Sequence, residues 1–461
     1  MGTSADGVWG SRLFCGVQAA TLTITTAPNP PSGARLTLLA SALTQLHADA
    51  VGAVVVAVYI TSLFVVAEVV FRIWSLPVEY TRKGTHVGAG LIVFAFPWLL
   101  EHTLTVTILA VSFGGILLGG RITGLLSSIH NVERRTSGAY YYPLAVLGVW
   151  LLSHGDPLLF CVPLAIMAIA DTGAAIVGQR AGETTYTVMD GTRSIEGSMA
   201  FFGLAFTIVL IASAVAGQPV WPATLLVALV VAALTTAIES VSVRGSDNVG
   251  IPYAAWLALE HTERLGLEAL GDWTLGMVFG VLLLLLTWTR ARLDVAGGVM
   301  VFVVATLTYA LGGWAWFLPI LAVYGGFLIA RTPDATTLER VFPTTASTVV
   351  VVLLYAHTDR QDLYVMYLTT VAASGAMGGL LIATARRWPR TLLGVAGALV
   401  PLVIAKAIQP DAHFFAPLAG ATAAFAALYL FQHVNAVGRR LAISLGIAVV
   451  VWAITVSIAA R

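Results

Sequence analysis

The chain has 461 residues, of which 58% are hydrophobic and only 10% are charged, and its formal net charge is +1. Soluble globular proteins carry about 45–50% apolar and about 25% charged residues, so this composition excludes an ordinary soluble protein. It also excludes an intrinsically disordered chain, which contains little apolar matter and much charge. The small net charge provides no bulk attraction to nucleic acid, so we expect no nucleic-acid partner.

Apolar runs of the length that a lipid bilayer requires recur from residue 48 to the C-terminus. A spanning helix needs roughly 17–25 such residues, so the runs predict an all-α fold, a polytopic transmembrane helical bundle of about 16 segments in two halves. The expected segments are 48–71, 87–101, 104–120, 140–153, 157–178, 198–216, 221–241, a short or re-entrant span at 251–262, 273–289, 295–311, 313–330, 343–356, 362–384, 391–408, 413–433 and 441–460.

The positions of arginine and lysine orient these segments in the membrane. If every segment crosses and the N-terminus lies outside, most of the 24 Lys and Arg residues fall in loops on the cytoplasmic side, as the positive-inside rule requires. Residues 1–47 show no convincing signal peptide and are expected to form a tail, flexible at Ala27–Gly33. The sequence therefore predicts an integral, multi-pass membrane protein with four polar clusters on the cytoplasmic face of the lipid bilayer.

The first polar cluster contains Arg82, Lys83 and His86, just before an expected helix. Such closely spaced side chains could bind a phosphate, Arg through its planar fork and Lys as a point charge. A positive-inside anchor with a capping histidine is the alternative.

The second cluster, residues 138–143, contains three consecutive tyrosines, which are also typical of an aromatic belt at a membrane interface.

The third cluster places Asp171 and Thr172 well inside an apolar run and is the most informative. A carboxylate among apolar side chains is costly unless it meets a cation, and Mg²⁺ suits one or two carboxylates plus phosphate oxygens. Gly178 and Gly182 follow at intervals of four and allow a close approach to another helix or to a ligand. A helix-packing glycine ladder with one paired aspartate is the alternative interpretation.

The loop after this run adds groups that could bind an anion. Thr192, Arg193 and Ser194 lie just before the next expected helix, whose first N–H groups are free to donate. Glu196 could be a second metal ligand, or it could orient Arg193.

The fourth cluster runs from Glu239 to Pro252 and crowds acidic, basic and amide side chains into a short loop. A plain turn would need only Gly245 and Pro252, and it remains the alternative. The presence of Asp247 and Asn248 beside these turn residues favours a binding role.

In order and spacing, the four clusters resemble the family of CTP-dependent polyprenol kinases, which includes dolichol kinase and phytol kinase. The matching residues are Arg82, Lys83, His86 and Gly90; Gly138, Tyr141 and Pro143; Ala170, Asp171, Thr172, Ala174, Gly178 and Gly182; Arg193, Ser194, Glu196, Gly197 and Ser198; and Glu239, Gly245, Asp247, Asn248 and Pro252. The family usually carries Lys where Arg193 stands, so the positive charge is kept. The resemblance implies transfer of the γ-phosphoryl group of CTP to a long-chain isoprenoid alcohol such as phytol, geranylgeraniol or dolichol.

The resemblance also implies a role for each matching group. Asp171 would hold Mg²⁺, the expected cofactor, Glu196 would support the metal or the loop, and His86 would accept the proton of the alcohol. The residues expected to bind the nucleotide are Arg82, Lys83, Thr172, Gly178, Thr192, Arg193, Ser194, Gly197, Ser198, Asp247 and Asn248. CTP and the isoprenoid alcohol, the expected partners, can meet only where water and bilayer adjoin.

The second half of the chain resembles a different membrane family, which includes phytyl-phosphate kinase. The match lies in 293–298 and 306–316, whereas the acidic stretch of that family is replaced by Ala372–Ala376. This half is therefore expected to be non-catalytic. The expected organisation is an N-terminal tail at 1–47, a polyprenol-kinase-like transmembrane domain at 48–262, a connecting segment and helix at 263–289, and a second transmembrane domain at 290–461.

Two other functions remain open. A cytidylyltransferase of the CDP-diacylglycerol synthase type has a similar Asp-Thr stretch, but its C-terminal signature is missing and Glu239–Pro252 stands in its place. A transporter would also fit a helix count of about 16 in two halves. Transporters, however, bind their substrates near the bilayer midplane, whereas these polar groups cluster at one face.

Overall fold

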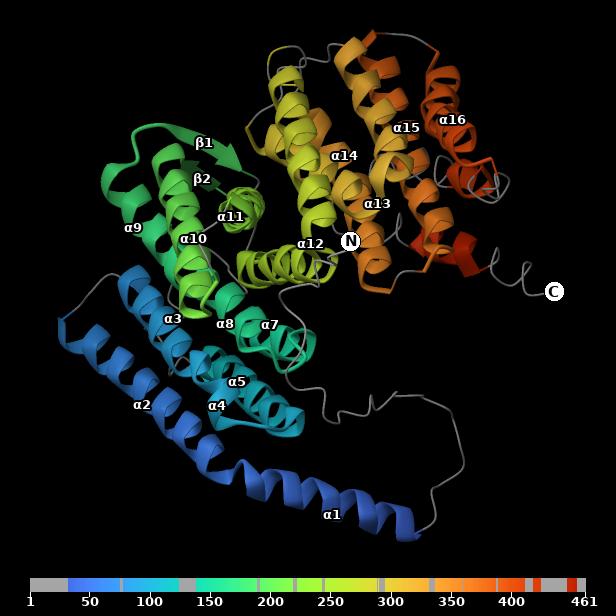
Figure 1. Cartoon of the computed structure of the whole chain (residues 1–461). Coiled ribbons are helices and arrows are strands. Elements are labelled where there is room, and N and C mark those ends of the chain that lie inside the picture. The colour runs from blue at the N-terminus through green and yellow to red at the C-terminus, as the bar shows by residue number, and fades with distance from the viewer. Residues whose placement is uncertain are drawn as a thin grey trace, which may run out of the picture. The chain divides into compact units, whose positions relative to one another are not determined.

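A computed structural model describes most of the residues of the chain. These are residues 32–74, 78–123, 138–188, 191–218, 222–242, 245–287, 289, 295–330, 336–358, 360–386, 389–410, 418–423 and 446–453. The regular elements in these ranges are helices, apart from one two-stranded sheet (Figure 1). Nine of the helices are long and apolar enough to cross a membrane. The predicted all-α, polytopic membrane bundle is confirmed.

The described chain divides into two compact units. Unit 1 contains residues 1–181 and 199–266, and unit 2 contains residues 182–198 and 267–461. The elements of unit 1 are α1 (Ser32–Ala48), α2 (Ala50–Trp74), α3 (Val78–Phe94), α4 (Phe96–Leu99), α5 (Thr103–Thr123), α7 (Gly138–Leu152), α8 (Pro157–Ala165), the π-helix η1 (Ile166–Ala170), α9 (Asp171–Ala181), most of α10 (Ile195–Val215), α11 (Pro222–Val241) and the first part of α12 (Asp247–Leu286).

Unit 2 contains a short hairpin and a set of long helices. Its elements are β1 (Thr185–Val188), β2 (Gly191–Ser194), the rest of α12, α13 (Val295–Ala330), α14 (Thr336–Thr358), α15 (Leu363–Arg386) and α16 (Arg390–Ile408). Helices α15 and α16 approach each other closely, because a Cβ on Gly375 would meet the main-chain oxygen of Gly397 and a Cβ on Gly379 would meet that of Leu393. Paired glycines of this kind let two membrane helices pack backbone to backbone.

Two long helices are each broken at one glycine. Gly266 in α12 has φ of 64° and Gly313 in α13 has φ of 62°, a left-handed conformation that favours glycine. Each break separates two of the segments expected from the sequence, 251–262 from 273–289 and 295–311 from 313–330. The count of nine takes Val295–Gly326 as one span, although it contains the expected segment 295–311 and most of 313–330.

Helix α3 begins earlier than the expected segment 87–101, because it starts at Val78. The hydroxyls of Thr81 and Thr85 donate to helix carbonyls of Val78 and Thr81, which satisfies them without water. Hydropathy alone misses this start because the first turns are polar. The consequence is that the whole first polar cluster lies within one helix rather than in a loop before it.

Two other segments differ from the expected organisation. Helix α1 runs from Ser32 in the predicted tail 1–47 to Ala48, so Ser32 and Gly33 of the segment expected to be flexible are helical. Residues 27–31 of that segment lie outside the described residues. The predicted loop before α10 contains the antiparallel hairpin β1–β2, paired from Thr185↔Ser194 to Val188↔Gly191. Alternate residues of β1, Tyr186 and Val188, are buried, which is the two-residue period of a strand with one covered face.

Candidate active site

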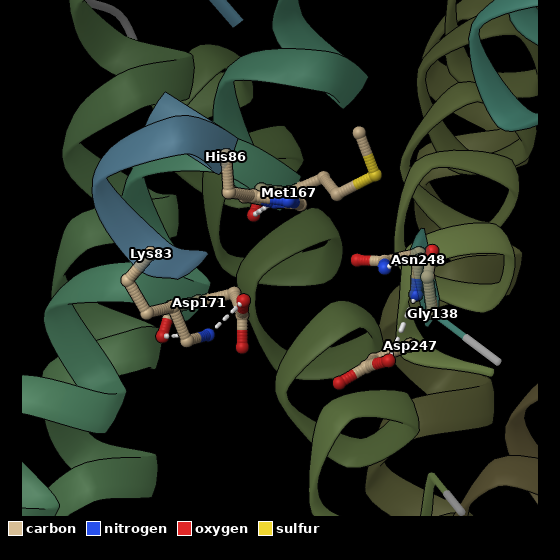
Figure 2. Close-up of polar contacts among 7 residues, drawn as sticks. All are labelled: Lys83, His86, Gly138, Met167, Asp171, Asp247 and Asn248. Atoms are coloured by element: carbon tan, nitrogen blue, oxygen red, sulfur yellow. Dashed lines mark hydrogen bonds and ion pairs between the residues drawn. The ribbon is translucent and has the colours of Figure 1, made fainter. Parts of the chain in front are cut away.

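Lys83 on α3 and Asp171 on α9 form a buried ion pair within unit 1. The Lys83 ammonium donates to Asp171 Oδ2 and also lies 3.4 Å from the main-chain oxygen of Asp171. The side chains are only 11% and 10% exposed. Removing a charge from water costs desolvation free energy. The attraction between the two charges offsets this cost only if both side chains are present. Figure 2 shows the two side chains pointing toward each other from separate helices.

A wide turn of helix precedes Asp171. Residues Ile166–Ala170 form a π-helix, which ends where the N–H of Asp171 donates to the carbonyl of Ile166. Such wide turns are rare in proteins and are frequent at functional sites. Helix α3 packs against this turn, and a Cβ on Gly90 would stand 2.8 Å from the Cβ of Ala168. Gly90 thus permits the close approach that brings α3 to the start of α9.

His86 lies one turn after Lys83 on the same helix and contacts the same π-helix (Figure 2). Its Nε2 is 3.2 Å from the carbonyl oxygen of Met167. Because a carbonyl oxygen can only accept, Nε2 carries the hydrogen in this contact, and Nδ1 of the neutral ring keeps a lone pair. The ring of Tyr142 packs edge-on against His86, with ring centroids 4.9 Å apart. The imidazole is therefore fixed in position and has one nitrogen able to accept a proton.

Two hydroxyl groups, one next to Asp171 and one near His86, are buried with no hydrogen-bond partner among the described residues. They are Thr172 Oγ1, next to Asp171, and Tyr142 Oη, on the helix that packs against His86. Leaving a buried hydroxyl unsatisfied costs roughly 1–3 kcal/mol, so native structures contain few. Such groups indicate a place where a ligand supplies the missing partner. Thr172 was expected in the site, whereas Tyr142 was not, because the run Tyr140–Tyr142 is also typical of an interfacial belt.

Asp247 and Asn248, two of the expected nucleotide-binding residues, open helix α12. Asn248 is buried, and its Nδ2 donates to the carbonyl oxygen of Gly138 at 2.8 Å, which fixes the start of α12 to the start of α7 (Figure 2). Asp247 Oδ1 accepts the N–H of Asn248 at 3.0 Å. Arg244 of the same cluster lies outside the described residues. The observed bonds join two helices of unit 1, and the expected contact with nucleotide stays a prediction.

The expected anion-binding loop forms the hairpin of unit 2 and the first turn of α10. Arg193 and Thr192 lie on β2 opposite Tyr186 and Thr187. Ser194 Oγ accepts the N–H of Gly197 at 3.1 Å, which makes Ser194 the N-cap of α10. The expected roles of these residues in nucleotide binding stay predictions.

Glu196 and Ser198 make contacts within the same segment. The Glu196 carboxylate accepts the N–H of Thr184 at 3.0 Å, and the hydroxyls of Ser198 and Tyr186 are 2.8 Å apart. The hairpin is thus closed by the first turn of α10. The expected metal ligation by Glu196 is not tested by these bonds, and neither is a role for Gly178, which lies half-buried on α9.

The donor groups around Asp171 fit a magnesium ion that arrives with a nucleotide. No group of three or more His, Cys, Asp or Glu side chains arranged for a metal occurs within the described ranges. Asp171 and Thr172 offer one carboxylate and one unpartnered hydroxyl. Mg²⁺ usually takes one or two carboxylates and completes its shell with substrate phosphates and water, so such a small protein donor set is sufficient.

The apolar helices of the chain define an integral membrane protein. Within the described residues, these helices enclose a cation–carboxylate pair, a fixed imidazole and unpartnered hydroxyls, which are the groups of a polar reaction or binding site. A phytol kinase of Synechocystis sp. is 32% identical to the chain over 204 residues, which make up 44% of this chain and 87% of that protein. The chain belongs to the phytol kinase family. No protein-family model and no solved structure matches the chain. The family expected from the ordered polar clusters is thereby confirmed.

Proposed function

We propose that this protein is a membrane kinase that transfers the γ-phosphoryl group of CTP to a long-chain isoprenoid alcohol. The single observation that carries the proposal is the buried Lys83–Asp171 pair with the unpartnered Thr172 hydroxyl beside it, in a chain that is similar to a phytol kinase. Phosphoryl transfer demands little covalent chemistry from a protein and depends on alignment and charge neutralisation. A cation, a carboxylate and a fixed base are the groups that this requires.

Each residue of the pair has a proposed task. Asp171 and Thr172 would hold the magnesium ion, which neutralises charge on the phosphate oxygens when it is bound. Lys83, released from Asp171, would bind phosphate oxygens as a point charge. Arg82, Arg193, Asp247 and Asn248 remain the proposed nucleotide contacts, on the strength of the family resemblance.

The alcohol would react beside His86. The alcohol oxygen forms a bond to the γ-phosphorus, the bond from that phosphorus to the bridging oxygen breaks, and CDP leaves with the electron pair. The proton of the alcohol passes to Nδ1 of His86, the nitrogen that the Met167 contact leaves with a lone pair. We place this site at the cytoplasmic face, on the basis of the distribution of arginines, because a nucleotide can reach it only from water.

The test is phosphoryl transfer from γ-labelled CTP by the full chain in membranes, with phytol, geranylgeraniol or dolichol as acceptor. We expect a labelled lipid phosphate with at least one alcohol, and a loss of more than about 100-fold in Asp171→Asn because a charge stabilising the transition state is removed. Glu68→Gln is the matched control, since Glu68 forms an i,i+4 ion pair with the exposed Arg72. Unlabelled ATP and GTP added in excess measure the preference for CTP.

The same assay separates the proposal from its alternatives. Release of pyrophosphate with CMP joined to a phospholipid would show a cytidylyltransferase instead. The transporter would be supported if the inserted, folded chain catalysed no nucleotide reaction but moved a lipid or an ion across the bilayer.

A further inference from the structure

The hydroxyl of Tyr142 is a buried polar group that the protein itself leaves without a hydrogen-bond partner among its described residues. Tyr142 lies in the first turns of α7, and Pro143 and Val146 beside it on that helix are buried. Hydroxyls enclosed by protein almost always find a partner, so an unpartnered one points to a bound molecule. The Tyr142 hydroxyl has no role in the reaction proposed above.

The position of this hydroxyl is defined by α3. The Tyr142 ring packs edge-on against His86, and a Cβ on Gly90 would stand 3.8 Å from Tyr142 Oη. Lys83, His86 and Gly90 are spaced at three and four residues, so they share one face of α3. The hydroxyl therefore lies about one turn beyond His86 along that face, on the side away from the Lys83–Asp171 pair.

The surroundings of the hydroxyl select a neutral ligand. The same Cβ position on Gly90 is 2.8 Å from the Cβ of Ala168 and 3.8 Å from the ring of Phe94, so two apolar groups lie beside the hydroxyl on the side away from His86. A charged phosphate would lose its hydration at such a place without a counter-charge. An alcohol on a hydrocarbon chain would lose little hydration free energy there. Its hydroxyl can both donate a hydrogen bond to a phenol and accept one from it.

We propose that Tyr142 Oη binds the hydroxyl group of the acceptor alcohol and holds it beside His86, so that Tyr142 determines the affinity for the alcohol and not for the nucleotide. This inference rests on the proposed function. Tyr142 touches the reacting oxygen before transfer, whereas Lys83 and Asp171 act on the phosphates. The hydrocarbon tail then extends from Gly90 into the apolar part of the bundle.

The test compares Tyr142→Phe with Tyr59→Phe in the full chain reconstituted in lipid. The Tyr59 hydroxyl donates to the carbonyl oxygen of Gly88 on α3 at 3.1 Å, so its loss removes a bond within the protein close to the same site. We expect Tyr142→Phe to raise KM for the alcohol by about tenfold, the effect of one lost hydrogen bond, with KM for CTP unchanged. Its Tm without ligand equals or exceeds that of the wild type, whereas Tyr59→Phe lowers Tm and leaves KM for the alcohol unchanged.

A binding measurement separates failure of this inference from failure of the proposed function. We expect geranylgeraniol to raise the Tm of the wild-type protein without any nucleotide, and we expect most of that rise to vanish in Tyr142→Phe. The role of Tyr142 would be overturned if geranylgeraniol stabilised the wild type and Tyr142→Phe equally. It would also be overturned if the Tm of Tyr142→Phe fell as low as that of Tyr59→Phe while its KM for the alcohol stayed unchanged. An alcohol that stabilises the wild type but is never phosphorylated would overturn the kinase and keep the binding residue. Absence of both stabilisation and phosphorylation would overturn both.

Discussion

The ammonium of Lys83 contacts both the carboxylate and the main-chain oxygen of Asp171, a residue 88 positions later in the chain. The pair joins α3 to α9 within unit 1 and supplies the only cation–carboxylate contact between these two helices among the described residues. Its burial makes it a stability element as well as part of the proposed site. The two contributions can be separated by substitution.

We expect Asp171→Asn to lower the free energy of unfolding by about 3–5 kcal/mol, because it leaves the Lys83 charge buried without its partner. The double variant Lys83→Met/Asp171→Leu should regain most of this stability, since an apolar pair of similar volume needs no counter-charge, yet it should remain without kinase activity. Unfolding in detergent and labelled-phosphate transfer measure the two effects.

Arg72→Gln is the control for this ion pair, because the Arg72 side chain that pairs with Glu68 is 63% exposed. Its effect on stability should be below about 1 kcal/mol. A double variant as unstable as Asp171→Asn would contradict the ion-pair explanation, and one that keeps its activity would contradict the proposed site.

Gly90→Ala should reduce activity, because the added Cβ would lie 2.8 Å from the Cβ of Ala168 and would push α3 away from the π-helix before Asp171. We expect a loss of more than about tenfold in kcat/KM, since small displacements of aligned groups are costly in catalysis. Gly84→Ala on the same helix is the matched control, because no atom lies within 4 Å of its added Cβ. It should raise helix stability by up to about 1 kcal/mol and leave kcat/KM unchanged. Equal activity in both variants would refute the close-approach role.

Ser194 offers a test of whether the hairpin residues bind nucleotide in addition to their structural contacts. Ser194→Ala removes the N-cap of α10 and should cost about 1 kcal/mol of stability. Ser194→Asp keeps a good cap but adds a negative charge where a phosphate is expected. If Ser194 binds phosphate, Ser194→Asp keeps its Tm and raises KM for CTP at least about tenfold. An unchanged KM for CTP in both variants would leave Ser194 a cap only.

Asp49, between α1 and α2, should make stability depend on pH. Burial raises the pKa of Asp49, but hydrogen bonds from the N–H groups of Glu101 and His102, each 3.0 Å long, and the contact with the His102 ring outweigh burial and hold the pKa below its ordinary value. A carboxyl whose pKa is lower in the folded state stabilises fully above its unfolded pKa, near 3.8, and this stability is lost as pH falls through the folded pKa.

The Asp49→Asn variant measures this contribution. An amide cannot accept both N–H bonds as the carboxylate does, so the variant should be less stable at pH 7 by about 1–3 kcal/mol. The difference between the wild type and Asp49→Asn should then shrink below pH of about 4, where the carboxyl of the unfolded chain begins to be protonated while that of the folded protein is still ionised. Tm recorded from pH 3 to 7 on both proteins checks this, and a difference independent of pH would contradict it.

The sequence by itself determined the class of the protein and its family. A chain with 58% hydrophobic and 10% charged residues must fold in a bilayer, where each backbone group has to be bonded within its own helix. The ordered clusters around Lys83, Asp171 and Asn248 identified the family. They were informative because polar groups in apolar runs cost free energy and therefore usually have a function. The apolar run around Asp171 also predicted that its carboxylate requires a cation.

Only the tertiary structure decided which cation meets Asp171 and which tyrosine faces the site. Lys83 rather than Arg82 contacts the carboxylate, because the face of α3 that carries Lys83 and His86 is the one that meets Met167 and Asp171. Tyr142 is identified by an unpartnered hydroxyl against His86, and the run of three tyrosines carries no signal for it. Both outcomes depend on where helices far apart in the chain come into contact. Local propensity and hydropathy describe one helix at a time, and they contain no information about which faces of two helices will meet.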